Sequence, residues 1–436
     1  MQTNLKALLQ RGEKPLFVFL SIYLIHWVYK NSVFPFYEYM GYTYNSPNIV
    51  LFIFFSCSLA FLSFFLPKKI NKVSDFFILF AYIHILIPIF TVPLYTIEDY
   101  ELLLWIPTLV IITCIWLSLF FLARLPTLKG ADLLHNKSSL RITVGLSIFF
   151  SLIVIASYGV NFTQLFTLSD ISKLYDLRMD FRDQNESVNI LSKYLFAWSA
   201  KVFIPFILII GVVRKSYTIV FSAIFLQLCI FAVNGQKTIL LGLFWVLFIV
   251  WTLKKSNSGE LLFRVLMLGI ITFCLADYLF GYDAFTNIIV RRMFMMPGLL
   301  TGYYLEYYSG NGFDYYSNSV LNGITDSIYS TTLAFTIGNQ YFSSDLMSAN
   351  ANIFASAFAN LGFTSLILEG LILFFLLYLV DSYTKAVDMR IALSLFTLPL
   401  MSLADSPLMT SIVTHGIFIA LVIAIIINTR KGYNGN

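Results

Sequence analysis

Two arginines in a polar stretch, residues 161–193, are the first side chains in this sequence whose spacing suits the binding of an anion. Arg178 and Arg182 stand four positions apart, so a helix over residues 171–182 would carry both guanidinium groups on one face. We predict that both act at a catalytic site. The alternative is a solvated amphipathic helix in which three carboxylates pair with the arginines, namely Asp176, Asp180 and Asp183.

A second polar stretch, residues 283–350, opens with Arg291 and Arg292 near the end of an apolar run. A guanidinium offers several donors in one plane, which is the geometry that a phosphate or diphosphate binds. Lys237 lies in a short turn between two apolar runs, where a cation is a candidate for function. We predict that Arg291 is catalytic and that Arg292 and Lys237 bind a diphosphate. The alternative for these side chains is snorkelling towards lipid headgroups.

Other residues suit the binding of a sugar or the transfer of a proton. Tyr303 could stack on a sugar ring and the Asn350 amide could bond its hydroxyls, so we predict that both bind sugar. An unperturbed histidine titrates near neutral pH, so His415 is predicted to be catalytic. The alternative is that it is structural, as we predict for His84. Carboxylates that could accept a proton instead are Asp283, Glu306, Asp314, Asp326, Asp345 and Asp405.

The composition shows which elements must position these residues. Hydrophobic residues make up 58% of the chain, charged residues 12%, and the mean hydropathy is +0.80. A soluble domain usually carries about twice that charged fraction. We therefore predict an all-α polytopic integral membrane protein with about 12 transmembrane helices. The net charge of +5 reflects basic cytoplasmic loops in this interpretation and indicates no nucleic-acid partner.

The apolar runs divide the chain into five parts. We predict about five N-terminal spans in residues 1–160, a first long periplasmic loop at 161–193, central spans in 194–282, a second long periplasmic loop at 283–350 and C-terminal spans in 351–436. The basic residues place both termini in the cytoplasm. Spans are predicted to begin near Pro15, Ile49, Phe76, Leu102, Ile142, Tyr194, Tyr217, Lys237, Leu261, Ala351 and, in two pieces, Ile391.

Four motifs between residues 161 and 369 resemble one known family. They read YDLRMDFR in the first loop, NGQK in the short turn, RRMFMMPG at the start of the second loop, and GNQYFSSDLMSANANIFASAFANLGFTS before the next span. This succession resembles the Wzy-type O-antigen or oligosaccharide repeat-unit polymerases of bacteria. Arg291 and Gly302 fit an Arg-x10-Gly pattern described for some members, whereas Arg178 has Asn189 at that offset and departs from it.

The resemblance implies a GT-C-like glycosyltransferase in the bacterial inner membrane. It implies transfer of a growing glycan from its undecaprenyl diphosphate carrier onto a new lipid-linked repeat unit at the periplasmic face, in O-antigen or capsule biosynthesis. The implied partners are lipid-linked donor and acceptor, membrane lipid and a co-polymerase that regulates chain length.

The sequence adds one expectation to this reading and leaves two alternatives open. No Asp-x-Asp motif occurs, so we predict catalysis without a metal or another cofactor. Two alternatives remain, namely an O-antigen ligase-like enzyme and a transporter, or flippase, of lipid-linked sugar.

Overall fold

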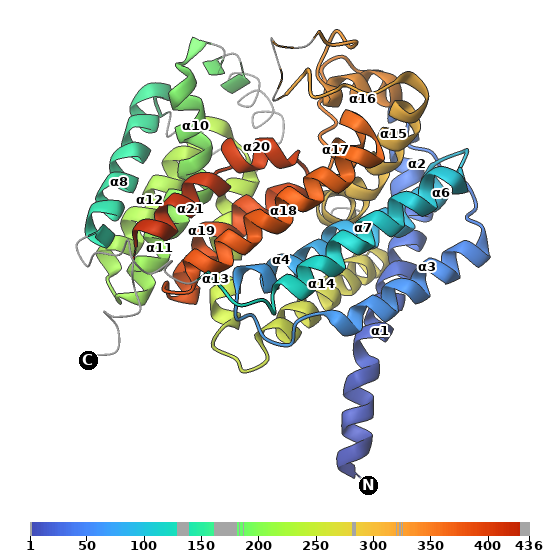
Figure 1. The fold of residues 1–436 in the computed structure, drawn as a ribbon, viewed down its shortest axis with the longest axis horizontal. Coiled ribbons are helices and arrows are strands. Elements are labelled where there is room, and N and C mark those ends of the chain that lie inside the picture. Colours follow the sequence, from blue (N-terminus) through green and yellow to red (C-terminus); the bar gives the residue numbers. More distant parts are fainter. Residues whose placement is uncertain are drawn as a thin grey trace.

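The computed structural model describes residues 2–128, 139–160, 181–182, 184–185, 187–280, 285–319, 321, 324 and 326–427, and these form helices and connecting turns without a strand (Figure 1). Arg178 and Asp283 lie outside the described residues. The first half of the chain forms α1 (Gln2–Val28), η1 (Tyr29–Val33), α2 (Phe34–Tyr37), η2 (Glu38–Met40), α3 (Ile49–Leu62), η3 (Ser63–Phe65), α4 (Val73–Ala81), η4 (Tyr82–Leu86), α5 (Ile87–Thr91), α6 (Pro93–Thr96), α7 (Leu102–Leu122), α8 (Ser139–Tyr158), α10 (Ile190–Trp198), η6 (Ser199–Phe203) and α11 (Ile204–Val213). The second half forms α12 (Tyr217–Asn234), α13 (Lys237–Thr252), α14 (Ser258–Phe280), η7 (Thr286–Met295), α15 (Met296–Asn311), α16 (Leu333–Phe342), α17 (Ile353–Leu361), α18 (Phe363–Thr384), α19 (Met389–Met401), η8 (Ser402–Ala404), α20 (Leu408–Val413) and α21 (Ile417–Ile426).

Among the described residues, nine helices are long and apolar enough to cross a membrane. The prediction of an all-helical, multi-pass membrane protein is confirmed in this coarse form. One predicted start is wrong: the span expected from Ala351 begins at Phe363. Asn352 caps the separate helix α17 by accepting bonds from the Phe354 and Ala355 amides, and Gly362, with φ +63°, ends it.

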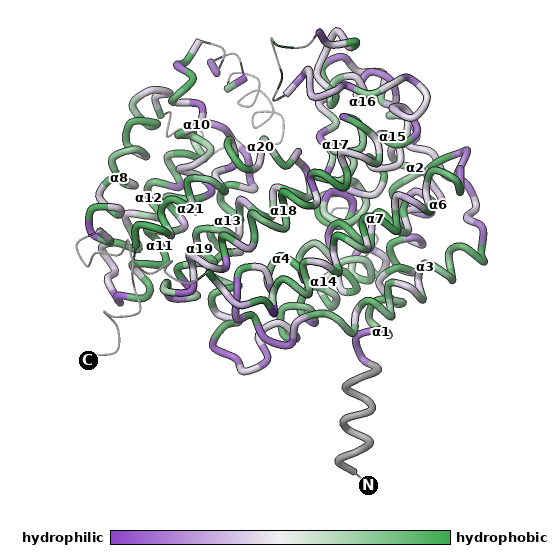
Figure 2. The backbone as a smooth tube through the Cα atoms, in the orientation of Figure 1, coloured by the Kyte–Doolittle hydropathy of each residue, from purple (hydrophilic) through white to green (hydrophobic). Residues whose placement is uncertain are grey.

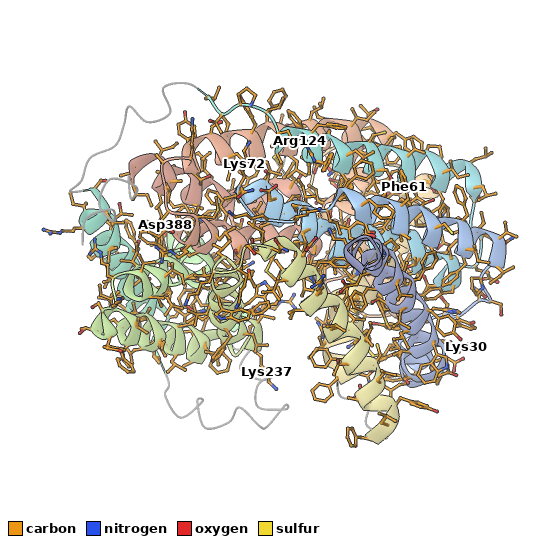
Figure 3. All side chains as sticks on the ribbon, turned by 90° about the horizontal axis from the view of Figure 1, so that it is seen from below. Lys30, Phe61, Lys72, Arg124, Lys237 and Asp388 are labelled. Atoms are coloured by element: carbon orange, nitrogen blue, oxygen red, sulfur yellow. The ribbon has the colours of Figure 1, made fainter. Side chains whose placement is uncertain are left out.

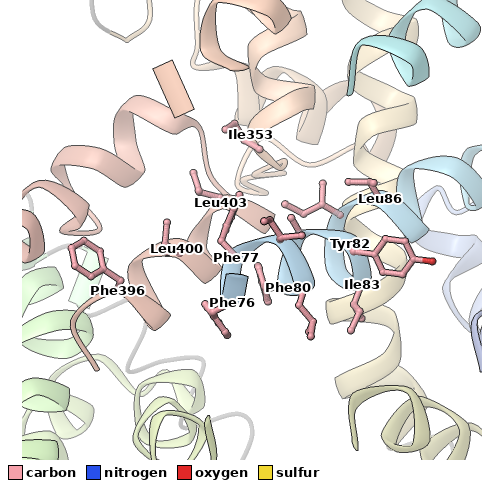
Figure 4. Close-up of a cluster of buried hydrophobic side chains, with 14 of the residues drawn as sticks. Phe76, Phe77, Phe80, Tyr82, Ile83, Leu86, Ile353, Phe396, Leu400 and Leu403 are labelled. Carbon is pink, nitrogen blue, oxygen red and sulfur yellow. The ribbon is translucent and has the colours of Figure 1, made fainter. Parts of the chain in front are cut away.

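The helices gather in two groups on either side of a central helix. One group, on the left of Figure 1, holds α8, α10 to α13 and α19 to α21, and the other holds α1 to α3, α5 to α7 and α14 to α18. Between them α4 contacts α19 of the first group and both α7 and α18 of the second. Figure 4 shows how the phenylalanines of α4 interlock with Leu400 and Leu403 from α19 and η8 and with Ile353 of α17. These side chains are buried, so α4 lies within the hydrophobic core of the protein.

Polar segments lie mainly at two opposite edges. Figure 2 shows apolar residues along the middle of the helices, and hydrophilic residues at the ends and in the turns. We call the edge with α10, α16 and α20 the upper edge, and the edge near which the turn between α13 and α14 lies the lower edge, as in Figure 1.

Four π-helical segments share one cause. In η1, η4, η6 and η7 the helix closes with a bond from an amide to the carbonyl five residues earlier, and a proline follows two residues after the segment ends. Proline has no amide hydrogen for the carbonyl four residues before it, so the wider turn accommodates its ring. Each segment carries a basic side chain, and these are Lys30, His84, Lys201 and the pair Arg291 and Arg292.

The second polar stretch folds into packed helices. Helix α15 is largely buried and packs against α5 and α17. Gly298 permits the contact with α5, because a Cβ at this position would overlap the Pro88 carbonyl oxygen. The Asn352 amide donates to the Pro297 carbonyl at 2.9 Å and to the Thr301 hydroxyl at 2.7 Å, which fixes α17 on α15.

Candidate functional site

The segment that carries Arg291 is held at its start by an acidic side chain of the preceding helix. The Asp277 carboxylate, at the end of α14, accepts hydrogen bonds from the amides of Phe285 and Thr286. These bonds satisfy amides at the start of η7 that have no helical partner. Arg291 is therefore presented from a helix anchored at its start by α14 and continued at its end by buried α15.

Arg291 is bound by two tyrosines from the distant N-terminal segment. Its Nη1 donates to the Tyr42 hydroxyl at 2.8 Å, its Nε donates to the Asn287 carbonyl at 3.1 Å, and its guanidinium carbon lies 4.2 Å from the centre of the Tyr37 ring. Tyr42 in turn donates to the Met296 sulfur at 3.1 Å, so its oxygen is free to accept from arginine. These contacts hold the guanidinium plane in one orientation.

The Arg291 guanidinium has further hydrogen-bond donors with which it could bind an anion. Arg291 is half-buried, and no carboxylate among the described residues lies within ion-pair distance of it. Its Nη2 donors make no hydrogen bond to a described residue. A positioned cation with unused donors is suited to a phosphate oxygen.

An aromatic cluster leads from Arg291 to a carboxylate. Tyr42 and Tyr303 both contact the Phe342 ring, with centroid distances of 5.8 and 5.7 Å. Tyr303 stacks on Tyr341 at 4.1 Å, and the Tyr341 hydroxyl donates to the Glu306 carboxylate at 3.1 Å. A cation and an acid are therefore joined by one continuous set of side-chain contacts.

Glu306 has the properties of a proton acceptor. It is exposed at the surface of α15, yet the protein around it raises the pKa of its carboxyl, and the nearby charges of Asp99 and Glu98 raise it further. The hydrogen bond from Tyr341 opposes this shift. A carboxylate with a raised pKa is a stronger base than an ordinary glutamate.

The two predicted sugar-binding residues lie in different environments. Tyr303 is only 2% exposed, stacks on Tyr341 and donates to the Gly41 carbonyl at 3.3 Å. Its ring packs inside the protein and is not open to a sugar in this structure. Asn350 is exposed.

The predicted cations are only partly brought together. Arg292 is exposed, and its charge acts on Tyr42 together with that of Arg291. The Arg182 guanidinium lies 5.5 Å from the centre of the Phe335 ring in α16, so the two polar stretches meet there. Lys237, the first residue of α13, is exposed and projects from the surface in Figure 3.

His415 belongs to a second polar cluster. Its Nδ1 lies 2.9 Å from the Lys201 Nζ and its Nε2 lies 3.1 Å from the Ser406 hydroxyl. Lys201 also donates to the Ser402 hydroxyl at 2.7 Å. Both ring nitrogens of His415 are therefore already engaged by protein groups.

Among the described residues, no three histidine, cysteine, aspartate or glutamate side chains converge as metal ligands. His84 is buried between the Phe80 and Phe294 rings, with Nδ1 3.4 Å from the Met293 carbonyl. The expectation of catalysis without a metal or cofactor stays a prediction.

Sequence reasoning missed the tyrosines that contact Arg291 and Glu306. Tyr37, Tyr42 and Tyr341 lie in aromatic-rich segments where nothing distinguishes them from interfacial tyrosines. Lys201 did have a signal, because it is a lone cation in an apolar run four residues before a proline.

Comparison with protein-family models, with curated proteins and with solved structures finds no match to this chain.

Proposed function

We propose that this protein is an integral membrane glycosyltransferase that polymerises undecaprenyl-diphosphate-linked oligosaccharide repeat units. It would transfer the growing glycan onto a new lipid-linked unit at the periplasmic face, in O-antigen or capsule biosynthesis. The observation that carries the proposal is Arg291, a guanidinium that Tyr42 and Tyr37 orient and whose Nη2 donors bond none of the described residues. The motifs around Arg291 that resemble the Wzy-type polymerases support the same reading.

We include in this proposal a topology of twelve membrane-spanning helices. Three shorter apolar helices, Ile49–Phe65, Lys237–Thr252 and Met389–Ala404, coincide with spans expected from the sequence and add to the nine longer ones. An even number of crossings leaves both termini on one side, which we assign to the cytoplasm of a bacterial inner membrane. The upper edge is then periplasmic.

The chemistry assigns one role to each end of the aromatic cluster. The acceptor hydroxyl oxygen forms a bond to the anomeric carbon of the donor glycan, while the bond from that carbon to the diphosphate oxygen breaks. Glu306 accepts the hydroxyl proton, and Arg291 stabilises the charge that the departing diphosphate gains. Arg292 adds a second positive charge beside Tyr42.

One observation favours a transporter instead. Lys201 is a cation inside the helix bundle, where a transporter would carry charged groups that line its path. A flippase would move lipid-linked sugar across a bilayer without forming a glycosidic bond.

The deciding experiment uses the purified protein in proteoliposomes with a defined undecaprenyl diphosphate repeat unit. A ladder of glycan multiples on a gel is expected for the wild type. The ladder should be lost in Arg291→Ala and retained in Arg124→Ala. Transfer of labelled lipid-linked sugar between leaflets without a ladder would overturn the polymerase proposal and favour a flippase.

A further inference from the structure

A carboxyl side chain is buried inside the membrane-spanning helix α18. Glu369 is 3% exposed and follows the first residue of this helix, Phe363, by six positions, which is about 9 Å along the helix. Its Oε1 accepts a hydrogen bond from the Tyr316 hydroxyl at 3.0 Å, whereas its Oε2 bonds none of the described residues. An ionisable group within a membrane span is a candidate for function.

A second oxygen without a partner lies beside this carboxyl. Asn360, near the end of α17, is 4% exposed and has its side chain next to Glu369. Its Nδ2 donates to the Ser356 carbonyl at 3.0 Å, so the atom left over is the amide oxygen Oδ1, which bonds none of the described residues. Buried polar atoms are normally hydrogen-bonded. Two acceptors on neighbouring side chains therefore lack a donor.

No positive charge in the described part of the chain neutralises Glu369. No lysine, arginine or histidine there lies within ion-pair distance of it, and no charged group contributes to its electrostatic environment. The helices packed against α18 are α4, α7, α17 and α21. Helices α17 and α21 have no titratable side chain, α7 has the exposed Cys114, and α4 has Asp75, which bonds the Asn71 and Lys72 amides. An ionised carboxylate in this environment is strongly destabilised.

The loop that supplies Tyr316 is bound to the end of α17. The Asp314 and Tyr315 amides donate to the Ala359 and Asn360 carbonyls, both at 2.9 Å. The Asp314 carboxylate accepts its hydrogen bonds from within the loop. Tyr315 and Tyr316 have φ angles of +56° and +62°, which residues other than glycine rarely adopt. This strained backbone is therefore held in place by α17 and by the bond from Tyr316 to the carboxyl of α18.

We propose that Glu369 is a proton-binding site and that its proton locks this loop, residues 312–319, onto α17 and α18. The proton on Oε2 donates to the Asn360 amide oxygen, so one hydrogen bond satisfies both unpartnered atoms, and Oε1 still accepts from Tyr316. A metal ion would take about six oxygen ligands, and only two oxygens are free here.

Loss of the proton to bulk water unlocks the loop. It leaves a negative charge on Glu369 that faces an amide oxygen and no cation, so water must enter to solvate the charge. Tyr316 is half-buried and joins Glu369 to the exposed part of the loop, so the loop has to move to admit that water. This inference assigns a role to a residue that the polymerase proposal does not use.

Infrared spectroscopy of the full-length protein in lipid nanodiscs tests the proton site, because a protonated carboxyl and a carboxylate absorb at different frequencies. We expect a protonated-carboxyl band at neutral pH that disappears at alkaline pH and is missing from Glu369→Gln. The control Glu101→Gln, at an exposed carboxylate, should keep the band. The proposal is overturned if Glu369→Gln removes no such band. It is also overturned if the band appears only in buffer without sodium, since a metal ion would then be the ligand.

Hydrogen exchange of the Asp314 and Tyr315 amides tests the lock, after correction for the intrinsic effect of pH on exchange. Their protection should fall at least tenfold as the wild type loses the infrared band. It should persist at alkaline pH in Glu369→Gln, because the glutamine amide donates and accepts as the neutral carboxyl does.

A second variant keeps the lock testable if Glu369→Gln does not fold. Tyr316→Phe retains the carboxyl but loses its bond to the loop, so it should lower the protection at least tenfold at neutral pH. Protection that does not depend on pH in the wild type, or that is unchanged in Tyr316→Phe, refutes the lock. Neither measurement uses ladder formation, so this proposal and the polymerase proposal fail independently.

Discussion

The replacement Arg291→Ala tests the diphosphate role most directly. No described residue accepts a hydrogen bond from the Nη2 donors of Arg291, and a hydrogen bond to a charged group contributes about 1.5–3 kcal/mol. Loss of one transition-state donor of this kind typically costs about 2.7–4 kcal/mol, or a factor of about 10²–10³ in rate. We therefore expect Arg291→Ala to slow ladder formation by about 10²–10³-fold.

The conservative variant separates charge from shape. Arg291→Lys keeps a positive charge but replaces the planar guanidinium with a compact ammonium. The ammonium cannot stack on the Tyr37 ring, bond the Tyr42 hydroxyl and offer two parallel donors at the same time. We expect a loss of about tenfold or more, because one charge-assisted bond of about 1.5 kcal/mol or more is missing.

Arg124 provides a matched control for folding. Its guanidinium lies 3.3 Å from the Phe120 ring centre and donates to the Phe120 carbonyl at 2.7 Å, so it combines an aromatic contact and a carbonyl bond as Arg291 does. Arg124→Ala should keep wild-type ladder formation. The assay follows initial rates in proteoliposomes, with the thermal unfolding midpoint of each variant measured in the same detergent. A rate for Arg291→Ala within threefold of wild type, or an equal loss in Arg124→Ala, would refute the reasoning.

Three further perturbations test other contacts. Tyr42→Phe removes the hydroxyl that orients Arg291 and should lower the initial polymerisation rate by about five- to thirtyfold, the equivalent of about 1–2 kcal/mol; an unchanged rate contradicts the orienting role. The protein around Glu306 raises the pKa of its carboxyl, and the base acts when it is ionised, so the wild-type rate should rise with pH through that raised pKa. Glu306→Gln should lose this limb of the pH–rate profile and about 10²–10⁴-fold in rate, and a profile that persists in the variant excludes Glu306 as the base. Gly298→Ala should lower the free energy of unfolding by about 1–3 kcal/mol, because the added methyl group overlaps helix α5. Gly145 has open space around it, so the control Gly145→Ala should not destabilise the protein. Denaturant titration of both variants measures the two free energies of unfolding.

Local features of the sequence determined much of the scaffold. Apolar runs of spanning length predicted the helices, since a chain in hydrocarbon must satisfy its own backbone hydrogen bonds and a helix does so within one segment. Prolines marked the π-helical turns for an equally local reason, because a missing amide hydrogen disturbs only the preceding turn. Lys201 was visible in the sequence as a cation four residues before such a proline.

The boundary near Ala351 shows where this local reasoning failed. The apolar residues after Ala351 predicted a continuous span, but Gly362 adopts a positive φ and α17 ends there. Asn352 then bonds α15, which lies about fifty residues earlier in the chain. The buried Asn352 amide needs hydrogen-bond partners, and α15 supplies them. A hydropathy pattern does not predict this requirement.

Tertiary structure alone decided which cations have partners. Arg291 and Tyr42 are 249 positions apart, and Lys201 and His415 are 214 positions apart, so no spacing rule joins them. Residue type predicts that a charge needs a partner but not which partner the fold supplies. Helix packing makes that choice: the close contact of α15 with α5 and the central position of α4 set which side chains face each other across the bundle.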